Sequence, residues 1–336
     1  MQLYVLITND CNLNCSICIR ANNDTKIQEM SFEAFKKMLQ SNDFEDDDLI
    51  ITGGEPTKHK RFCDIVMYAC EKINNVYVTT NGTMNYYIGE LSKFDNLSFQ
   101  VSLDGDESSN DLIRGTGVYS KICRTLSNYE KVGIKYSVAS VVSKKNIKSI
   151  KKMIPILSEL KKMKYWRISY EMPFGNARFE DMLTIEEWND FVDEVIQEAH
   201  FRLKIQKLYP FELYDKRFRE MENLCVNNKR SNNCGSGGDK LYIYPDLSVY
   251  SCTCLSDFSL GNLNNMTLAE IRNGSEIKEF INYKINDDIP CGECKYLAFC
   301  NGGCIGMSYH YFGELGKGDI RCPILRRFYE EKGVLL

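Results

Sequence analysis

The 336-residue sequence lacks the features that mark membrane, secreted and nucleic-acid-binding proteins. It has no apolar run long enough to span a bilayer, and its N-terminus lacks the basic-then-apolar layout of a secretory signal. A formal net charge of −4 gives no electrostatic reason to expect a nucleic acid as a partner. Only three histidines occur, and none has the spacing of paired metal ligands. We therefore expect a cytoplasmic protein that binds neither a membrane nor a nucleic acid.

Cysteine, by contrast, is abundant, with 15 in the chain. Structural disulfides do not persist in a reducing cytosol, and an odd number of cysteines cannot be fully paired. The cysteines therefore indicate metal or redox chemistry. They fall into two groups, one near the N-terminus and one from residue 225 onwards, with only three in the long middle.

Up to about residue 205, short β-rich runs alternate with segments whose apolar residues have helical spacing. Six strands are predicted, at residues 3–8, 49–52, 76–80, 97–103, 135–142 and 165–170. Helices are predicted between them, one behind a cap at Ser31 and one behind a capping box of Thr184 and Glu187. This alternation predicts an α/β fold with a parallel sheet, open or curled into a barrel, whose ligands gather at the C-terminal ends of the strands.

The pattern changes after about residue 215, where cysteine and glycine become dense. Residues 240–245 and 249–252 are typical of a β-hairpin with a turn between them. We therefore expect two domains, residues 1–215 and residues 216–336.

Directly after the first predicted strand, Cys11, Cys15 and Cys18 lie on one tight loop. Three thiolates can hold three irons of a four-iron cluster and leave the fourth iron open to a chelating molecule. The alternative is zinc, although three cysteines alone do not complete a tetrahedral site. In this Cys-x3-Cys-x2-Cys motif the sequence resembles the radical S-adenosylmethionine (SAM) superfamily.

The resemblance extends to the ends of the next strands, with Gly53-Gly54-Glu55-Pro56 after the second. It implies a partial (β/α)6 TIM-like barrel and a [4Fe-4S] cluster that binds SAM. An electron donor such as flavodoxin or ferredoxin is implied as a partner. The implied contacts with SAM are Gly53, Gly54 and Glu55 at its amino group, and Asn81, Ser102, Asp104 and Arg114 at its ribose and carboxylate.

The C-terminal cysteines resemble the SPASM domain, an extension found on many radical SAM enzymes. The resemblance implies one or two auxiliary [4Fe-4S] clusters. An outer cluster would be held by Cys291, Cys294, Cys300 and Cys322, and an inner one by Cys234, Cys252 and Cys304. The fourth inner ligand would be Cys225, which we prefer, or Cys254, unless the site stays open for substrate. A pair of zinc ribbons is the alternative for this region.

SPASM-bearing relatives mostly modify peptides, so the resemblance implies a maturase of ribosomally made peptides (RiPPs). Such an enzyme removes hydrogen from a precursor peptide and forms a thioether or carbon–carbon crosslink. The main alternative is a peptide epimerase with Cys254 or Cys225 as hydrogen donor. Because the chain begins at its first predicted strand, we expect a separate leader-binding protein or recognition of the peptide by the chain itself.

Three further functions are less favoured. Sulfatase-maturing relatives have an aspartate base after the second SPASM cysteine, where this chain has Thr253, which cannot act as a base near neutral pH. Small-molecule cofactor biosynthesis is an alternative from another enzyme class. An electron carrier would have no use for the Gly-Gly-Glu-Pro motif.

Overall fold

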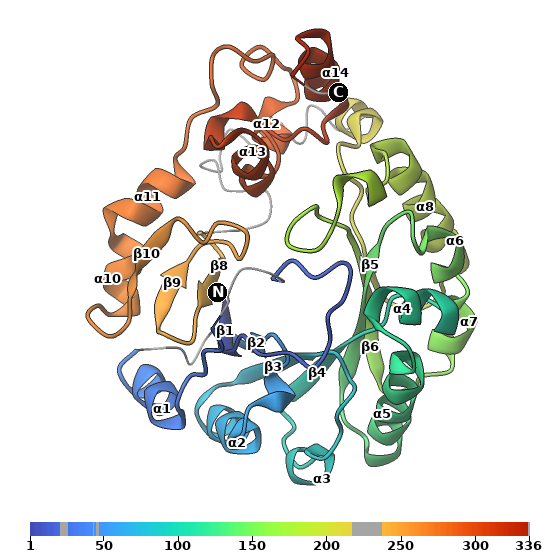
Figure 1. Cartoon of the computed structure of the whole chain (residues 1–336), viewed down its shortest axis with the longest axis vertical. Helices are drawn as coiled ribbons and strands as arrows, with labels where there is room; N and C mark the ends of the chain where they lie inside the picture. Colours follow the sequence, from blue (N-terminus) through green and yellow to red (C-terminus); the bar gives the residue numbers. More distant parts are fainter. Residues whose placement is uncertain (21–25, 43, 45–46, 217–236, 335–336) are drawn as a thin grey trace.

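One curved sheet forms the framework of the protein in a computed structural model that describes residues 1–20, 26–42, 44, 47–216 and 237–334. In these residues the sheet has ten strands, in the order β10-β9-β8-β1-β2-β3-β4-β5-β6-β7. Figure 1 shows the helices on the outside of its curve. The strands are β1 (Gln2–Thr8), β2 (Asp48–Gly53), β3 (Asn75–Thr80), β4 (Leu97–Ser102), β5 (Tyr136–Val142), β6 (Met163–Tyr170), β7 (Leu203–Lys204), β8 (Lys240–Ile243), β9 (Ser248–Tyr250) and β10 (Ser259–Asn262).

The strands from β1 to β7 pair in parallel, as the strand–helix alternation predicts. The six predicted strands are β1 to β6, so the partial TIM-like barrel is confirmed. From Trp166 onwards every second residue of β6 is buried, namely Trp166, Ile168 and Tyr170, while Tyr165 and Arg167 line the cavity inside the curve. The sheet therefore has an apolar outer face and an inner face that is free to carry polar groups.

Two helices of the barrel half begin at the caps that the sequence predicts. The helices of this half are α1 (Phe32–Gln40), α2 (Phe62–Lys72), α3 (Ile88–Leu91), α4 (Glu107–Arg114), α5 (Val118–Val132), α6 (Ile147–Ile150), α7 (Met153–Ser158) and α8 (Ile185–Glu198). The Ser31 hydroxyl caps α1 by accepting from the Ala34 N–H at 3.1 Å. The capping box of Thr184 and Glu187 at the start of α8 is also confirmed.

The predicted hairpin is present as β8 and β9, but it is part of the barrel sheet. Strand β8 pairs in parallel with β1, from Gln2 opposite Lys240 to Val5 opposite Ile243. The hairpin thus attaches the C-terminal half directly to the first strand of the barrel. The boundary between residues 215 and 216 stays a prediction.

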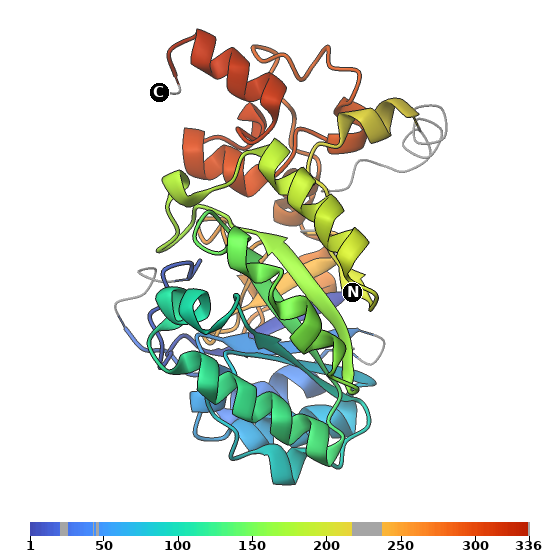
Figure 2. The ribbon, with the colours of Figure 1, turned by 90° about the vertical axis from the view of Figure 1, so that its right-hand side faces the viewer.

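Besides β8, β9 and β10, the described part of the C-terminal half contains short helices. They are α10 (Leu268–Asn273), α11 (Ser275–Ile281), α12 (Leu297–Cys300), α13 (Ile305–Phe312) and α14 (Pro323–Glu331). Figures 1 and 2 show α12, α13 and α14 together at one end of the long axis, next to α8. None of the helices in the described ranges is long and apolar enough to pass through a bilayer.

Candidate active site

A cavity of about 930 Å³ lies inside the curve of the sheet. Its wall contains the cysteine loop after β1 and side chains that point inward from the strands. It brings together most of the residues that the sequence implicates in binding a cluster and SAM, namely Cys11, Cys15, Cys18, Gly53, Gly54, Glu55, Asn81, Ser102 and Arg114. Asp104 is not part of the wall.

The cysteine loop is held from two sides by asparagines. The Asn81 amide donates to Asn12 Oδ1 at 2.9 Å and approaches Cys11 Sγ at 3.9 Å. On the other side, the Asn176 amide donates to the Cys15 carbonyl at 3.0 Å. Its backbone N–H donates to the Cys18 carbonyl at 2.9 Å. Sequence reasoning missed Asn176, although the Gly-Asn pair at the end of β6 is a turn signal.

Gly175 is required for this approach. Its φ of 63° lies in the left-handed region, and a Cβ there would collide with the Cys18 carbonyl oxygen. The turn after β6 can therefore touch the cysteine loop only because position 175 has no side chain.

The donor set of the loop fits the expected [4Fe-4S] cluster. Burial raises the pKa of Cys15 to about 11, with Arg114 acting in the opposite direction and the Cys18 and Cys11 thiolates adding to the rise. The three thiols are therefore close enough to influence one another. Among the described residues no three His, Cys, Asp or Glu side chains converge as around a single metal ion. Thiolates that each bind a different iron of a cluster need not converge in that way.

The Gly-Gly-Glu motif joins the ends of three strands. Cβ atoms on Gly53 and Gly54 would collide with the backbone carbonyls of residues 8–10, so the glycines let this loop lie against the start of the cysteine loop. The Glu55 carboxylate is fully buried. It accepts from the Thr57 N–H and hydroxyl at 3.1 and 2.6 Å, from the Thr80 hydroxyl at 2.6 Å and from the Asn81 N–H at 2.6 Å. Three of these bonds end on Oε1 and one on Oε2, so Oε2 can accept one more hydrogen bond.

Asp104 lies behind Arg114. Its carboxylate is fully buried and accepts from Arg114 Nε at 2.6 Å and from the Val141 N–H at 2.8 Å. Arg114 itself lines the cavity next to Cys15 and Cys18. The contacts of Asp104 therefore orient the guanidinium and do not reach into the cavity.

The C-terminal cysteines form two groups in the structure. Burial raises the pKa of Cys291 to about 12, and the Cys300, Cys322 and Cys294 thiolates add to the rise. These four thiols thus lie near one another, as the prediction of an outer cluster requires. Cys304 and Cys252 belong to the second group, since the Cys252 thiolate raises the pKa of Cys304.

Cys254 also belongs to the second group. Its backbone N–H donates to Cys252 Sγ at 3.4 Å, and both Cys254 Cβ and Cys304 Sγ would lie 3.6 Å from a Cβ on Gly306. The neighbouring Thr253 is buried and lines the large cavity. Cys225 and Cys234 lie outside the described residues, so their predicted roles as ligands stay predictions.

A buried ion pair stands beside the second group. Arg321 donates to the Asp319 carboxylate from Nη2 at 2.6 Å and from Nε at 3.0 and 3.1 Å. Asp319 Oδ2 also accepts from the Cys304 N–H at 3.1 Å, and the Asp319 carbonyl accepts from the Cys322 N–H at 2.9 Å. Asp319 thereby connects a predicted inner ligand with a predicted outer one.

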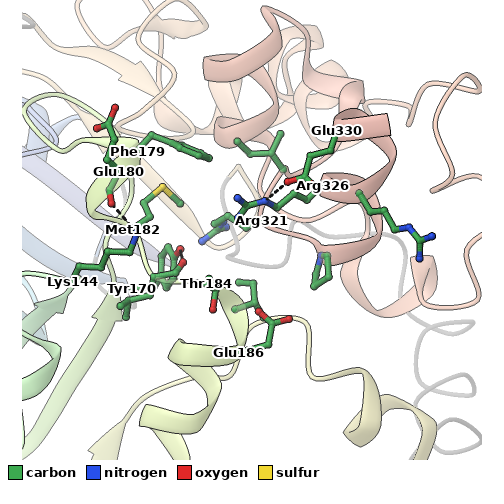
Figure 3. A pocket seen from close by; sticks show the side chains of 15 residues that line it. Lys144, Tyr170, Phe179, Glu180, Met182, Thr184, Glu186, Arg321, Arg326 and Glu330 are labelled. Atoms are coloured by element: carbon green, nitrogen blue, oxygen red, sulfur yellow. Dashed lines mark hydrogen bonds and ion pairs between the residues drawn. The ribbon is translucent and has the colours of Figure 1, made fainter. Parts of the chain in front are cut away.

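Figure 3 shows a second pocket, of about 540 Å³, between the start of α8 and α14. Arg321 reaches it over the ring of Tyr170, 5.4 Å from the ring centroid, with the Arg326–Glu330 ion pair on the far side. No predicted cysteine or SAM-binding residue lines this pocket in the part of the chain that the structure describes. The large cavity inside the sheet is therefore the candidate active site.

The sequence matches two known families. Residues 5–154 match the radical SAM superfamily, and residues 234–295 match SPASM, an iron–sulfur cluster-binding domain. Together the two matches include the cysteine loop and the hairpin of β8 and β9.

Relatives with known roles cover most of the chain. Fe-coproporphyrin III synthase of Methanosarcina barkeri is 25% identical over 96% of this chain and 88% of its own length. The cysteine-type anaerobic sulfatase-maturating enzyme of Clostridium novyi is 23% identical over 96% and 92%. The antilisterial bacteriocin subtilosin biosynthesis protein AlbA of Bacillus subtilis is 28% identical over 89% and 65%.

A solved structure has the same fold. SuiB of Streptococcus suis, bound to its precursor peptide SuiA, superposes with a TM-score of 0.77 at 17% identity, covering 97% of this chain and 75% of that one.

Proposed function

Because this chain belongs to the radical SAM superfamily and carries a SPASM domain, we propose that it is a RiPP maturase that forms a thioether or carbon–carbon crosslink in a precursor peptide. The radical SAM domain makes the chain an enzyme that uses a [4Fe-4S] cluster with SAM. Its SPASM domain binds iron–sulfur clusters. An electron donor such as flavodoxin or ferredoxin is part of the proposal. The relationship to AlbA, a bacteriocin biosynthesis protein, supports a peptide as substrate.

The observation that carries the proposal is the position of the second cysteine group. Thr253, directly after Cys252, lines the same cavity as Cys11, Cys15 and Cys18. A substrate in the cavity would therefore lie between the two groups. When bound, the N-terminal cluster with SAM would supply a 5′-deoxyadenosyl radical as acceptor of one hydrogen atom, and the auxiliary clusters would supply an acceptor for one electron. A crosslink removes two hydrogens, the second as this electron and a proton released to solvent, so both acceptors are needed.

The residues around the cavity bind and orient in this proposal. The Arg114 guanidinium donates to the carboxylate of SAM, and Asp104 holds the guanidinium in place. Ser102 meets the ribose. Glu55 lines the cavity and its Oε2 accepts only the Asn81 N–H, so in this proposal Oε2 also accepts from the amino group of SAM, beside the backbone at Gly53 and Gly54.

Two observations weigh on the alternatives. Thr253 borders the cavity where sulfatase-maturing relatives have a base, which disfavours that reaction. The nearly full-length similarity to Fe-coproporphyrin III synthase favours tetrapyrrole chemistry as the second candidate function. Epimerisation remains the third, with Cys254 as the hydrogen donor that the structure describes.

Mass spectrometry tests the proposal. A small peptide encoded beside the gene would be coexpressed with the enzyme anaerobically in heavy water, with a Cys15→Ala variant as control. Loss of two hydrogens supports a crosslink. Gain of one deuterium means epimerisation and contradicts the crosslink. An unchanged peptide together with conversion of coproporphyrin would replace the proposal by the second candidate.

A further inference from the structure

The cavity wall carries more cationic side chains than the predicted binding of the cluster and SAM explains. Among its described residues are six cationic side chains and two carboxylates, Glu55 and Asp48. The Glu55 carboxylate already accepts four hydrogen bonds. Of the cations, Arg114 pairs with Asp104, and Arg20 lies over the Tyr244 ring. The remaining four cations, all on or beside β6 and β7, are Lys164, Arg167, Arg202 and Lys204.

Strand register places three of these cations on one face. Arg167 of β6 is directly opposite Lys204 of β7. Arg202 precedes Lys204 by two residues and therefore points to the same side. The outward neighbours Trp166 and Leu203 form the other pair of the ladder. The inner face of β6 and β7 thus presents a patch of Arg167, Arg202 and Lys204, called the cationic patch below.

Like charges opposite one another destabilise a sheet unless a counter-charge is present. Within the described ranges, neither the Arg167 nor the Arg202 side chain has an ion-pair or hydrogen-bond partner. Lys204 lies over the Tyr165 ring at 3.9 Å, and no described carboxylate pairs with it. In this part of the chain the patch therefore lacks a counter-charge.

The patch lies level with the predicted SAM site. Across the sheet, Ser102 pairs with Ala139, Ala139 with Arg167, and Arg167 with Lys204, and all four line the cavity. Strands lie about 4.8 Å apart, so Arg167 is about 10 Å from Ser102 along this row. A group bound at the patch would hold the rest of its molecule beside the predicted ribose contact.

We propose that the cationic patch binds a carboxylate of the substrate. Arginine forms paired hydrogen bonds with a carboxylate, and Lys204 adds a third donor from the neighbouring strand. The inference rests on the proposed function: the substrate is then a peptide with an aspartate or glutamate side chain, or its C-terminal carboxylate, next to the modified residue.

Binding, not turnover, tests this site. The full chain with its clusters would be titrated anaerobically with short peptides labelled with a neutral coumarin dye. One peptide carries three glutamates and an amidated C-terminus, a second carries three glutamines instead, and a third carries the glutamines with a free C-terminus. We expect the glutamate peptide or the free-carboxylate peptide to bind about tenfold more tightly than the amidated glutamine peptide. Whichever does so identifies the source of the carboxylate.

Variants assign the effect to the patch. Arg167→Gln should weaken binding of the tighter peptide about fivefold to tenfold and leave binding of the amidated glutamine peptide unchanged. Arg167→Lys should recover part of the lost affinity. Lys204→Gln serves as a second variant because Lys204 is exposed and its loss spares the fold. Arg124→Gln, an exposed arginine on α5, is the matched control and should change nothing.

Equal binding of all three peptides would overturn the carboxylate site. So would variants that lose the same affinity for the tighter peptide and for the amidated glutamine peptide. That result is separate from a failure of the proposed function. If the coexpressed peptide is modified while Arg167→Gln and Lys204→Gln bind every probe normally, only the site is wrong. If the patch binds carboxylates but coproporphyrin, which carries four of them, is the molecule converted, only the peptide proposal is wrong.

Discussion

The two halves of the molecule each place a buried aspartate–arginine pair beside cysteines, but they assemble this arrangement differently. In the barrel half, the three cysteines occupy eight consecutive residues, and the pair is Asp104 with Arg114. In the C-terminal half, Asp319 and Arg321 are two residues apart, while the cysteines around them extend from residue 252 to residue 322. The barrel half has a local cysteine motif, and its aspartate–arginine ion pair comes from a later segment of the chain. The C-terminal half has dispersed cysteines around an ion pair whose two residues are local.

The difference shows which contacts each half depends on. In the barrel half, the ion pair closes the cavity behind Cys15 and Cys18, while the loop is held by Asn81 and Asn176. In the C-terminal half, Asp319 itself holds the backbone at Cys304 and Cys322. Breaking the pair should therefore disturb the cysteine geometry more in the C-terminal half.

The largest expected effect separates the two halves by activity. Cys15→Ala removes one of three loop thiols, so production of 5′-deoxyadenosine should fall at least about a thousandfold, to background. The measurement is chromatography of 5′-deoxyadenosine after anaerobic reduction with dithionite. Cys123→Ala, on α5 outside the cavity, is the matched control and should behave as wild type. Normal turnover by the Cys15 variant would refute the assignment of the loop.

The second prediction compares the two ion pairs directly. Asp104→Asn and Asp319→Asn each leave a buried guanidinium without its counter-charge, which costs about 3–5 kcal/mol of unfolding free energy. Anaerobic urea denaturation would measure both losses. Glu331→Gln, which breaks an exposed pair with Arg327, should leave stability unchanged within error.

The two aspartate variants should differ in how much iron the protein holds. Because Asp319 holds Cys304 and Cys322, Asp319→Asn should lose auxiliary iron, whereas Asp104→Asn should keep it. Equal iron in both variants would mean that the two pairs serve their halves in the same way, and the contrast drawn above would be wrong.

The third prediction tests whether the auxiliary cysteines act after radical formation. Cys294→Ala should reduce peptide product by about 10–100-fold while reducing 5′-deoxyadenosine much less. Both compounds would be quantified from the same reaction. A parallel fall of the two would indicate that the C-terminal half mainly supports the fold of the barrel.

The smallest expected effect concerns Glu171. Its two chain neighbours, Tyr170 and Met172, both contact Arg321. Burial raises the pKa of Glu171 from its usual 4.5 to about 7, against opposing effects of Ser143 and Lys145. A raised carboxyl pKa means that the folded state binds the extra proton, so stability falls as pH rises from 4.5 to about 7.

Glu171→Gln removes this cost. The variant should gain about 1–3 kcal/mol of unfolding free energy at pH 8 and almost nothing at pH 4, which lies below both pKa values. Urea denaturation at the two pH values would measure it. The same gain at both values would show that ionisation is not the cause.

Local patterns predicted most of the barrel. Short β-rich runs that alternate with helical segments identified β1 to β6, and the Thr184–Glu187 capping box identified the start of α8. The two-residue strand β7 was missed because two residues carry no periodicity. Position 247 shows another limit: Leu247 adopts a left-handed φ of 68° in the hairpin turn, a conformation that glycine favours, and its buried side chain offsets that cost.

The candidate site was predictable only where its residues follow one another or end a strand. Cys11, Cys15 and Cys18 and the Gly-Gly-Glu motif were found in that way. Asn176 and Asp319 were not, because a single polar residue has no signal until folding brings it beside a distant cysteine. The bond that Asp104 accepts from Val141, and those that Glu55 accepts from Thr80 and Asn81, likewise depend on neighbouring strands.

Thiol spacing, strand periodicity and turn residues are local properties that the sequence by itself contains. They sufficed to predict a parallel α/β sheet and, through the resemblance of the motifs, the radical SAM match, its cofactor and the partial barrel. Only the tertiary structure decided which groups face one another. It placed Thr253, the neighbour of Cys252, at the cavity and joined β8 to β1. It also aligned Arg167 and Lys204 with Ser102. Those relations follow from strand register and burial, which no short stretch of sequence contains.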